Sequence, residues 1–165
     1  MIIIVIYIIF SFLLDAIMSN ILPFNLSDPS FLKTIYSIIS LVIVYNYFDN
    51  HQKYITILIL LGVFFDIVYT NTFIVNIVIF LIIYIILSYL DYIITTNIIT
   101  INLKSIVCIS SYHILTYIIL LLANYNTYSI KLLGIILLRS IIMTIIYTTI
   151  SYLIMNKILD NKRIK

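Results

Sequence analysis

Long apolar runs constrain this chain more than any other feature of its sequence. Six stretches consist almost entirely of Ile, Leu, Val, Phe and Tyr: residues 2–14, 35–45, 54–65, 77–90, 106–123 and 132–155. None carries the charged stripe that a soluble helix presents to water opposite its buried face. With 64% hydrophobic and 9% charged residues and a mean hydropathy of +1.25, the sequence predicts a membrane protein.

The periodicity favours helices over strands, although Ile and Val are frequent in strands of soluble proteins. Transmembrane strands alternate polar and apolar residues over ~10 positions, whereas the run at 106–123 is apolar on every side. In lipid, such a segment satisfies its backbone hydrogen bonds as a helix. We therefore predict an all-α integral membrane protein with one transmembrane domain over residues 1–165. The predicted spans of this six-transmembrane-helix bundle are 2–22, 31–48, 54–70, 73–90, 105–123 and 131–155.

The predicted connections are short and polar. A loop at 20–30 contains Pro23 and Pro29, and a charged turn follows at 49–53. The longest connection, 91–104, is amphipathic enough to lie along the membrane interface.

An even number of spans puts both termini on one side of the membrane. The positive-inside rule makes that side the cytoplasm, because only Lys33 and Lys131 then lie outside. The cations on the cytoplasmic side are Lys53, Lys104, Lys157, Lys162, Arg163 and Lys165. We expect a multi-pass protein of the plasma membrane with a basic cytoplasmic tail at 156–165.

Two aspartates, Asp15 and Asp66, interrupt the apolar runs. A carboxylate at bilayer depth costs ~2.5–3.5 kcal/mol on insertion scales, so it must face the protein interior, pair with a cation or bind a ligand. Gly62, Asp66 and Thr70 are spaced by four and share one helix face, where the glycine allows another helix to approach closely. Ser11 precedes Asp15 at the same spacing.

Arg139 in the last span is the obvious counter-charge for these carboxylates. The ~1.5 Å rise per residue of a helix places Asp15, Asp66 and Arg139 in the outer half of the membrane. An Asp15–Arg139 pair is therefore geometrically possible, with Asp66 as the second candidate. Two interpretations stay open: a buried ion pair that fixes the order of the helices, or carboxylates that hold a partner or ligand.

Residues for catalysis and for metal binding are scarce. The chain has no Glu and two glycines, so neither a phosphate-binding loop nor a Gly-x-Ser-x-Gly elbow is present. His113 has no second His or Cys at ligand spacing. Asp15 with Asp66 lacks the Gly-rich context of an intramembrane aspartyl protease. We expect no catalytic residue, no metal, no cofactor and no nucleic-acid partner, and we find no repeat of 20–50 residues and no match between the two halves.

Two segments resemble a known bacterial family. Phe10–Phe24 (FSFLLDAIMSNILPF) is similar to the opening span of the rod shape-determining protein MreD family, in which an aspartate stands late in an apolar run before a Pro-containing loop. Gly62–Thr72 (GVFFDIVYTNT) is similar to that family's Gly-x-x-x-Asp segment on the third span, which a short polar turn follows. The family usually has Ser, Gly and Pro in this turn, where the present chain has Tyr69, Asn71 and Thr72.

The resemblance implies a non-catalytic scaffold subunit of the cell-elongation (rod-shape) machinery. Such a subunit binds the single-span protein MreC and, through it, links MreB filaments to peptidoglycan synthases. Gly62, Asp66 and Asp15 match the family's motif, and with Arg139 they are the candidate packing and partner-binding residues. The family's helix arrangement resembles that of the S components of energy-coupling factor transporters, so vitamin uptake is the alternative function. A homodimer is a further possible association.

Overall fold

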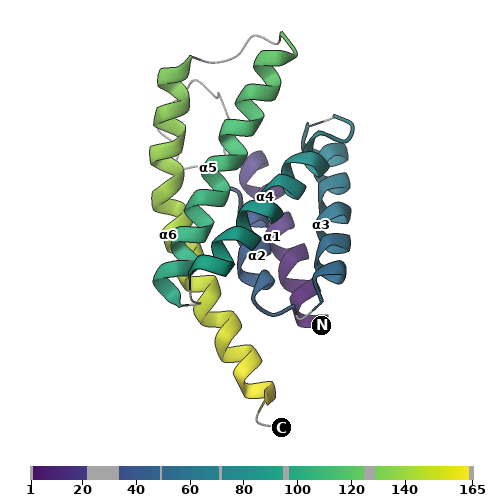
Figure 1. Ribbon diagram of the computed structural model, residues 1–165, viewed down its shortest axis with the longest axis vertical. Coiled ribbons are helices and arrows are strands. Elements are labelled where there is room, and N and C mark those ends of the chain that lie inside the picture. Colours follow the sequence, from purple (N-terminus) through teal and green to yellow (C-terminus); the bar gives the residue numbers. More distant parts are fainter. Residues whose placement is uncertain are drawn as a thin grey trace.

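The computed structural model describes residues 2–21, 34–48, 50–70, 72–94, 97–124 and 129–163. They form six α-helices in the order α1 (Ile2–Ile21), α2 (Tyr36–Tyr45), α3 (His51–Phe65), α4 (Val75–Ile93), α5 (Ile98–Leu122) and α6 (Ile130–Arg163) (Figure 1). One π-helical turn, η1 (Asp66–Thr70), continues α3. The described residues contain no strand, so the all-α prediction is confirmed.

Four helices are long and apolar enough to cross a membrane: His51–Thr70, Val75–Ile93, Ile98–Leu122 and Ile130–Ile158. The other two apolar stretches, Ile2–Met18 of α1 and Tyr36–Tyr45, are shorter. At ~1.5 Å per residue α2 rises only ~15 Å, which is half of a ~30 Å hydrocarbon core. The prediction of six spans is therefore not confirmed.

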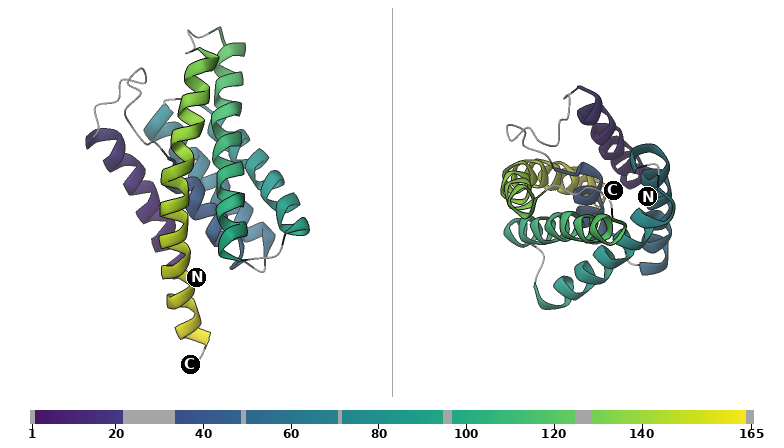
Figure 2. Two further views of the ribbon diagram at one scale, coloured as in Figure 1. Left: turned by 90° about the vertical axis from the view of Figure 1, so that its left-hand side faces the viewer. Right: turned by 90° about the horizontal axis from the view of Figure 1, so that it is seen from above.

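The short helix α2 forms the centre of the bundle. All ten of its residues are buried, and α1, α5 and α6 pack against it (Figure 2). The core continues from Ile39 and Val42 of α2 to Leu58 of α3 and Phe80 of α4. A helix buried on all sides has no polar face, which explains why its sequence gave no amphipathic signal.

The segment between α4 and α5 differs from the prediction. The interfacial connection expected at 91–104 is wrong, because α4 runs to Ile93 and α5 begins at Ile98. Asn97 starts α5 with a capping box: its side chain accepts from the Ile99 N–H at 2.8 Å, and its own N–H donates to Thr100 Oγ1 at 2.8 Å. The polar residues that suggested a surface segment thus form the start of a helix.

The longest helix, α6, extends past the rest of the bundle at its C-terminal end (Figure 1). Its 34 residues rise ~51 Å, and its C-terminal part lies beyond the other helices, at the end of the bundle where the N-terminus also lies (Figure 1). The predicted tail at 156–165 is therefore helical as far as Arg163. The predicted loop at 20–30, apart from the end of α1, and residue Lys165 lie outside the described residues.

Candidate functional site

Asp66 binds the N-terminus of the helix that follows it. Its Oδ1 accepts hydrogen bonds from the Asn76 backbone N–H at 2.9 Å, from Asn76 Nδ2 at 2.8 Å and from Thr72 Oγ1 at 2.6 Å. Asn76 lies in the first turn of α4, where backbone N–H groups lack partners within the helix. The buried carboxylate therefore caps α4 and interacts favourably with its dipole.

The Asp66 network extends to a third helix through Asn76. Asn76 Oδ1 accepts from the Tyr112 hydroxyl of α5 at 2.9 Å, and Asn76 Nδ2 also donates to Thr70 Oγ1 at 2.9 Å. Neither Asn76 nor Tyr112 stands out in the sequence, because each is one of many Asn and Tyr residues. The network joins η1, α4 and α5 around one carboxylate.

Asp15 caps the N-terminus of α2 in the way that Asp66 caps that of α4. Its Oδ1 accepts from the Tyr36 N–H at 2.9 Å, and its Oδ2 accepts from the Ser37 N–H at 2.9 Å and from Ser37 Oγ at 2.5 Å. Since α2 is only ten residues long and wholly buried, its N-terminus lies inside the protein rather than at a surface. Asp15 supplies the acceptors that this buried helix end needs.

The two sites are built alike. In each, the N-cap residue is an isoleucine, Ile35 for α2 and Ile74 for α4, which has no side-chain oxygen to cap its own helix. In each, the aspartate binds the polar residue two positions later, Ser37 or Asn76, through both its backbone and its side chain. The α1–α2 and α3–α4 pairs thus share one capping arrangement.

A matching sequence pattern accompanies this arrangement. The segment SFLLDAIMSN at 11–20 aligns with GVFFDIVYTN at 62–71, with the aspartate, the hydroxyl residue and the asparagine in register. The match is shorter than a repeat of 20–50 residues, because it covers ten positions, and most of its residues are apolar. This local repeat is the signal that could have predicted a shared role for Asp15 and Asp66.

Gly62 brings α3 and α4 together one turn before Asp66. A Cβ atom at Gly62 would lie 2.9 Å from Ile77 Cα, closer than van der Waals contact allows. The structure agrees with the close approach expected from the sequence. The short separation lets the Asp66 carboxylate reach the first turn of α4.

Arg139 does not join the two aspartates. Within the part of the chain that the structure describes, it forms no ion pair with Asp15 or Asp66. The physical reason is that the N-termini of α2 and α4 supply backbone N–H donors to the two carboxylates. The buried side of α6 carries Ser140 and Thr144, and Arg139 lies ~100° around the helix from Ser140, half-buried on another face.

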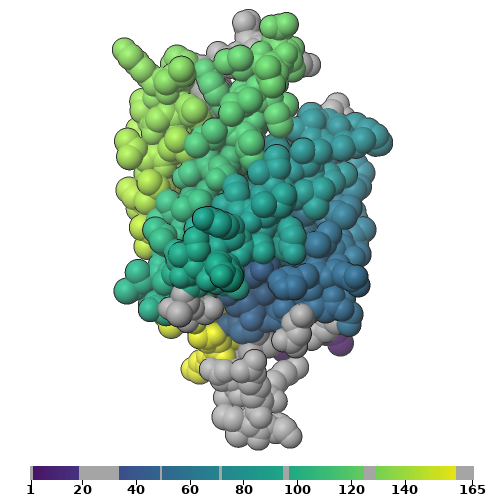
Figure 3. Space-filling view, viewed as in Figure 1, coloured from purple at the N-terminus to yellow at the C-terminus, as the bar shows by residue number. Residues whose placement is uncertain are grey.

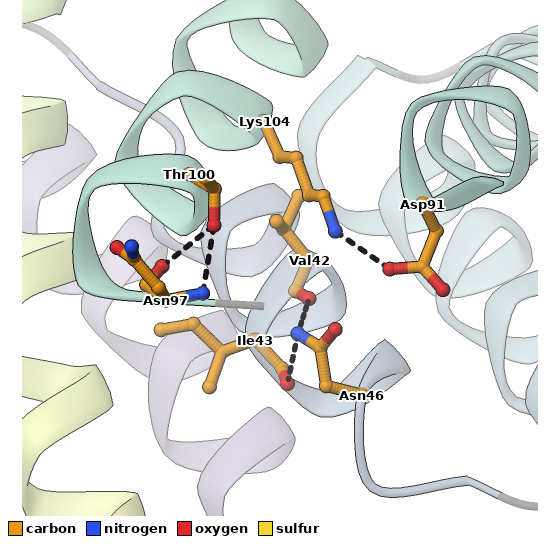
Figure 4. Close-up of polar contacts among 7 residues, drawn as sticks. All are labelled: Val42, Ile43, Asn46, Asp91, Asn97, Thr100 and Lys104. Carbon is orange, nitrogen blue, oxygen red and sulfur yellow. Dashed lines mark hydrogen bonds and ion pairs between the residues drawn. The ribbon is translucent and has the colours of Figure 1, made fainter. Parts of the chain in front are cut away.

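The ion pair of the described residues is elsewhere, between Lys104 and Asp91. Lys104 Nζ of α5 lies 2.6 Å from Asp91 Oδ1 of α4, and the Lys104 side chain is fully buried (Figure 4). Lys104 was expected to be a cytoplasmic loop cation, but it belongs to α5 because that helix starts earlier than predicted.

The C-terminal end of α2 is stabilised beside this pair. Asn46 Nδ2 donates to the carbonyl oxygens of Val42 at 3.3 Å and Ile43 at 3.4 Å (Figure 4). At the other end of α2, the Asp15 carboxylate complements the helix dipole. The central helix thus has a hydrogen-bonding side chain at each end.

His113 of α5 is buried, and its ring packs edge-on against Tyr112 at 5.9 Å between ring centroids. Among the described residues, no three His, Cys, Asp or Glu side chains gather as metal ligands would.

Over the described residues, the fold and this site define a helical bundle with four helices long and apolar enough to cross a membrane and with two aspartates that cap helix N-termini. No protein-family model, no curated protein and no solved structure matches the chain.

Proposed function

We propose that this chain is a non-catalytic membrane scaffold subunit of the bacterial cell-elongation machinery, similar to the MreD family. In this role it lies in the plasma membrane with both termini in the cytoplasm, binds MreC, and through MreC links MreB to peptidoglycan synthases. One observation carries the proposal: Asp15 and Asp66, the aspartates of the two MreD-like segments, each cap the next helix. These motifs therefore serve the shape of the bundle.

The same observation favours a scaffold over an uptake protein. In many transporters the N-terminus of an interrupted helix points at an anionic group of the substrate. Here the buried N-terminus of α2 receives Asp15, and that of α4 receives Asp66. The two helix ends best suited to an external anion are already bound to carboxylates of the chain itself.

A depletion experiment in a rod-shaped bacterium that carries the gene tests the proposal. We expect depleted cells to become round and the wild-type gene to restore rods. Asp66→Ala should restore rods poorly, and the control Ile85→Val, at an exposed position of α4, should restore them fully. Rod-shaped depleted cells with a new vitamin requirement would refute the scaffold role and support an S component.

A further inference from the structure

Helix α6 is the least covered of the four long helices. In its most apolar stretch 11% of the residues are buried, against 28–33% in the other three. Most of its described buried positions carry small polar side chains, namely Ser140, Thr144, Thr148 and Ser151, and the remaining one is Met155. On the other side Leu138 is 69% exposed and Ile142 is 52% exposed. Helix α6 lies at the front of the bundle and crosses it from one end to the other (Figure 2, left).

The upper parts of α5 and α6 also stand above α3 and α4 (Figures 1 and 3). There the exposed apolar residues include Leu122 at 74%, Ile130 at 73% and Leu138 at 69%. This end of the α5–α6 pair has no third described helix beside it at the same height (Figures 1 and 2). This end of the pair therefore presents exposed apolar side chains.

Gly134 of α6 serves no packing purpose within the described chain. A Cβ atom at Gly134 would meet nothing within 4 Å, whereas one at Gly62 would meet the backbone of Ile77. Glycine within a helix costs ~1 kcal/mol relative to alanine. An open glycine on a membrane helix permits the close approach of another helix backbone.

Arg139 supplies a second, independent feature of the same surface. This half-buried side chain forms no hydrogen bond or ion pair with a described residue. At 100° per residue, Gly134, Leu138, Ile142 and Arg139 follow one another around α6. Leu138 and Ile142 therefore form a ridge, with the glycine on one flank and the guanidinium on the other.

We propose that this ridge, with its two flanks, is the docking surface for a transmembrane helix that carries an Asp or Glu side chain. The partner backbone approaches α6 at Gly134, and its carboxylate pairs with Arg139, since a guanidinium matches a carboxylate in two parallel hydrogen bonds. A single cation in an apolar surface calls for an opposite charge at the same depth. This inference rests on the proposed scaffold function and names its docking surface.

Site-specific photocrosslinking in the native host tests the surface. A photoreactive phenylalanine replaces Leu138 or Ile142, and the control position is Ile85 of α4, which is 65% exposed at a similar depth from its helix end. We expect the proposed single-span partner to be captured from 138 and 142 and not from 85. Arg139→Gln should lower the yield about tenfold, the worth of one strong interhelical polar contact, while Arg139→Lys retains most of it.

Gly134→Leu should also abolish capture, because the added side chain occupies the space in which the partner backbone approaches α6. Since a side chain at 134 has open space within the chain itself, this variant should fold and accumulate as wild type does. Capture of lipid or of a second copy at 138 and 142, with the partner captured from 85, would overturn the docking surface and leave the scaffold role standing. No capture of the partner from any face, including a scan of α1 and α3, would refute both proposals.

Discussion

Ser37 and Asn76 are structural counterparts in two different helices. Each donates its backbone N–H, at 2.9 Å in both cases, and a side-chain group to an aspartate of the preceding helical segment. Each follows an N-cap isoleucine by two positions. The first four helices are thus assembled as two hairpins in which the outgoing helix holds the start of the returning one.

Replacing Asp66 should loosen the start of α4. In Asp66→Ala three hydrogen bonds to a charged oxygen disappear, and the buried N–H of Asn76 is left without its acceptor. We expect a loss of about 3 kcal/mol in the free energy of unfolding. Thermal melting of the purified protein in detergent, followed by tyrosine fluorescence, measures it.

Asp66→Asn is the matched control for that experiment, because its amide oxygen can still accept from Asn76. It should lose less than half as much stability as Asp66→Ala. Equal melting temperatures for Asp66→Ala and wild type would show that this carboxylate does not hold α4.

Asp15 should be coupled energetically to Ser37 and not to Arg139. The Ser37 hydroxyl donates to Asp15 Oδ2 at 2.5 Å, whereas Arg139 forms no ion pair with Asp15. In double-mutant cycles with alanine, we expect Asp15 and Ser37 to deviate from additivity by at least ~1 kcal/mol, and Asp15 and Arg139 to add within ~0.5 kcal/mol. Unfolding midpoints of the single and double variants provide both cycles.

The reverse result would restore the ion pair that the sequence suggested. A coupling of ~1 kcal/mol or more between Asp15 and Arg139, with additive Asp15 and Ser37, would mean that the helix order depends on the two charges.

The sequence predicted which residues matter in the interior better than it predicted their partners. Composition and periodicity led to the helices, and the spacing of Gly62 and Asp66 led to a close approach beside a carboxylate. A cation was expected as the partner of each buried carboxylate, because charged side chains can be identified from the sequence. Backbone N–H groups at a helix start are not visible there, since every residue has one.

Two parts of the fold could not be predicted from the sequence, for a different reason. The apolar run at 35–45 was extended to a predicted span at 31–48, but α2 covers only Tyr36–Tyr45, and its tertiary position makes it a short central helix. The segment at 91–104 contains polar letters that suit a surface stretch as well as a capping box, and Asn97 with Thr100 decides in favour of the helix start. Where a local sequence pattern fits two structures, the packing of the folded chain decides which of them forms.

The two glycines should respond to alanine in opposite ways. In Gly62→Ala the new Cβ would lie 2.9 Å from the Ile77 backbone, so α3 and α4 must separate, at a cost of about 1–3 kcal/mol. In Gly134→Ala nothing lies within 4 Å, and the helix gains up to ~1 kcal/mol from the better propensity of alanine. Melting temperatures should fall for the first variant and stay equal or rise for the second.

The chain should be less stable with Lys104 but without the Asp91 charge than with neither charge. Lys104 is fully buried and its ammonium lies 2.6 Å from Asp91, so Asp91→Asn leaves a buried cation without its counter-charge. We expect this variant to lose about 3 kcal/mol of stability. Lys104→Met fills the same space without a charge and leaves Asp91, which is 36% exposed, hydrated at the edge of the bundle.

The double variant of Asp91→Asn with Lys104→Met separates charge pairing from simple packing. If pairing dominates, the double variant melts above Asp91→Asn alone, because removing the cation relieves the penalty that the first substitution created. If the Lys104 stem and its place beside the C-terminal end of α2 dominate, the double variant melts below both single variants. Melting of the four proteins in one detergent decides between these outcomes, and with them whether the charges or the apolar contacts fix the N-terminal part of α5 against α2.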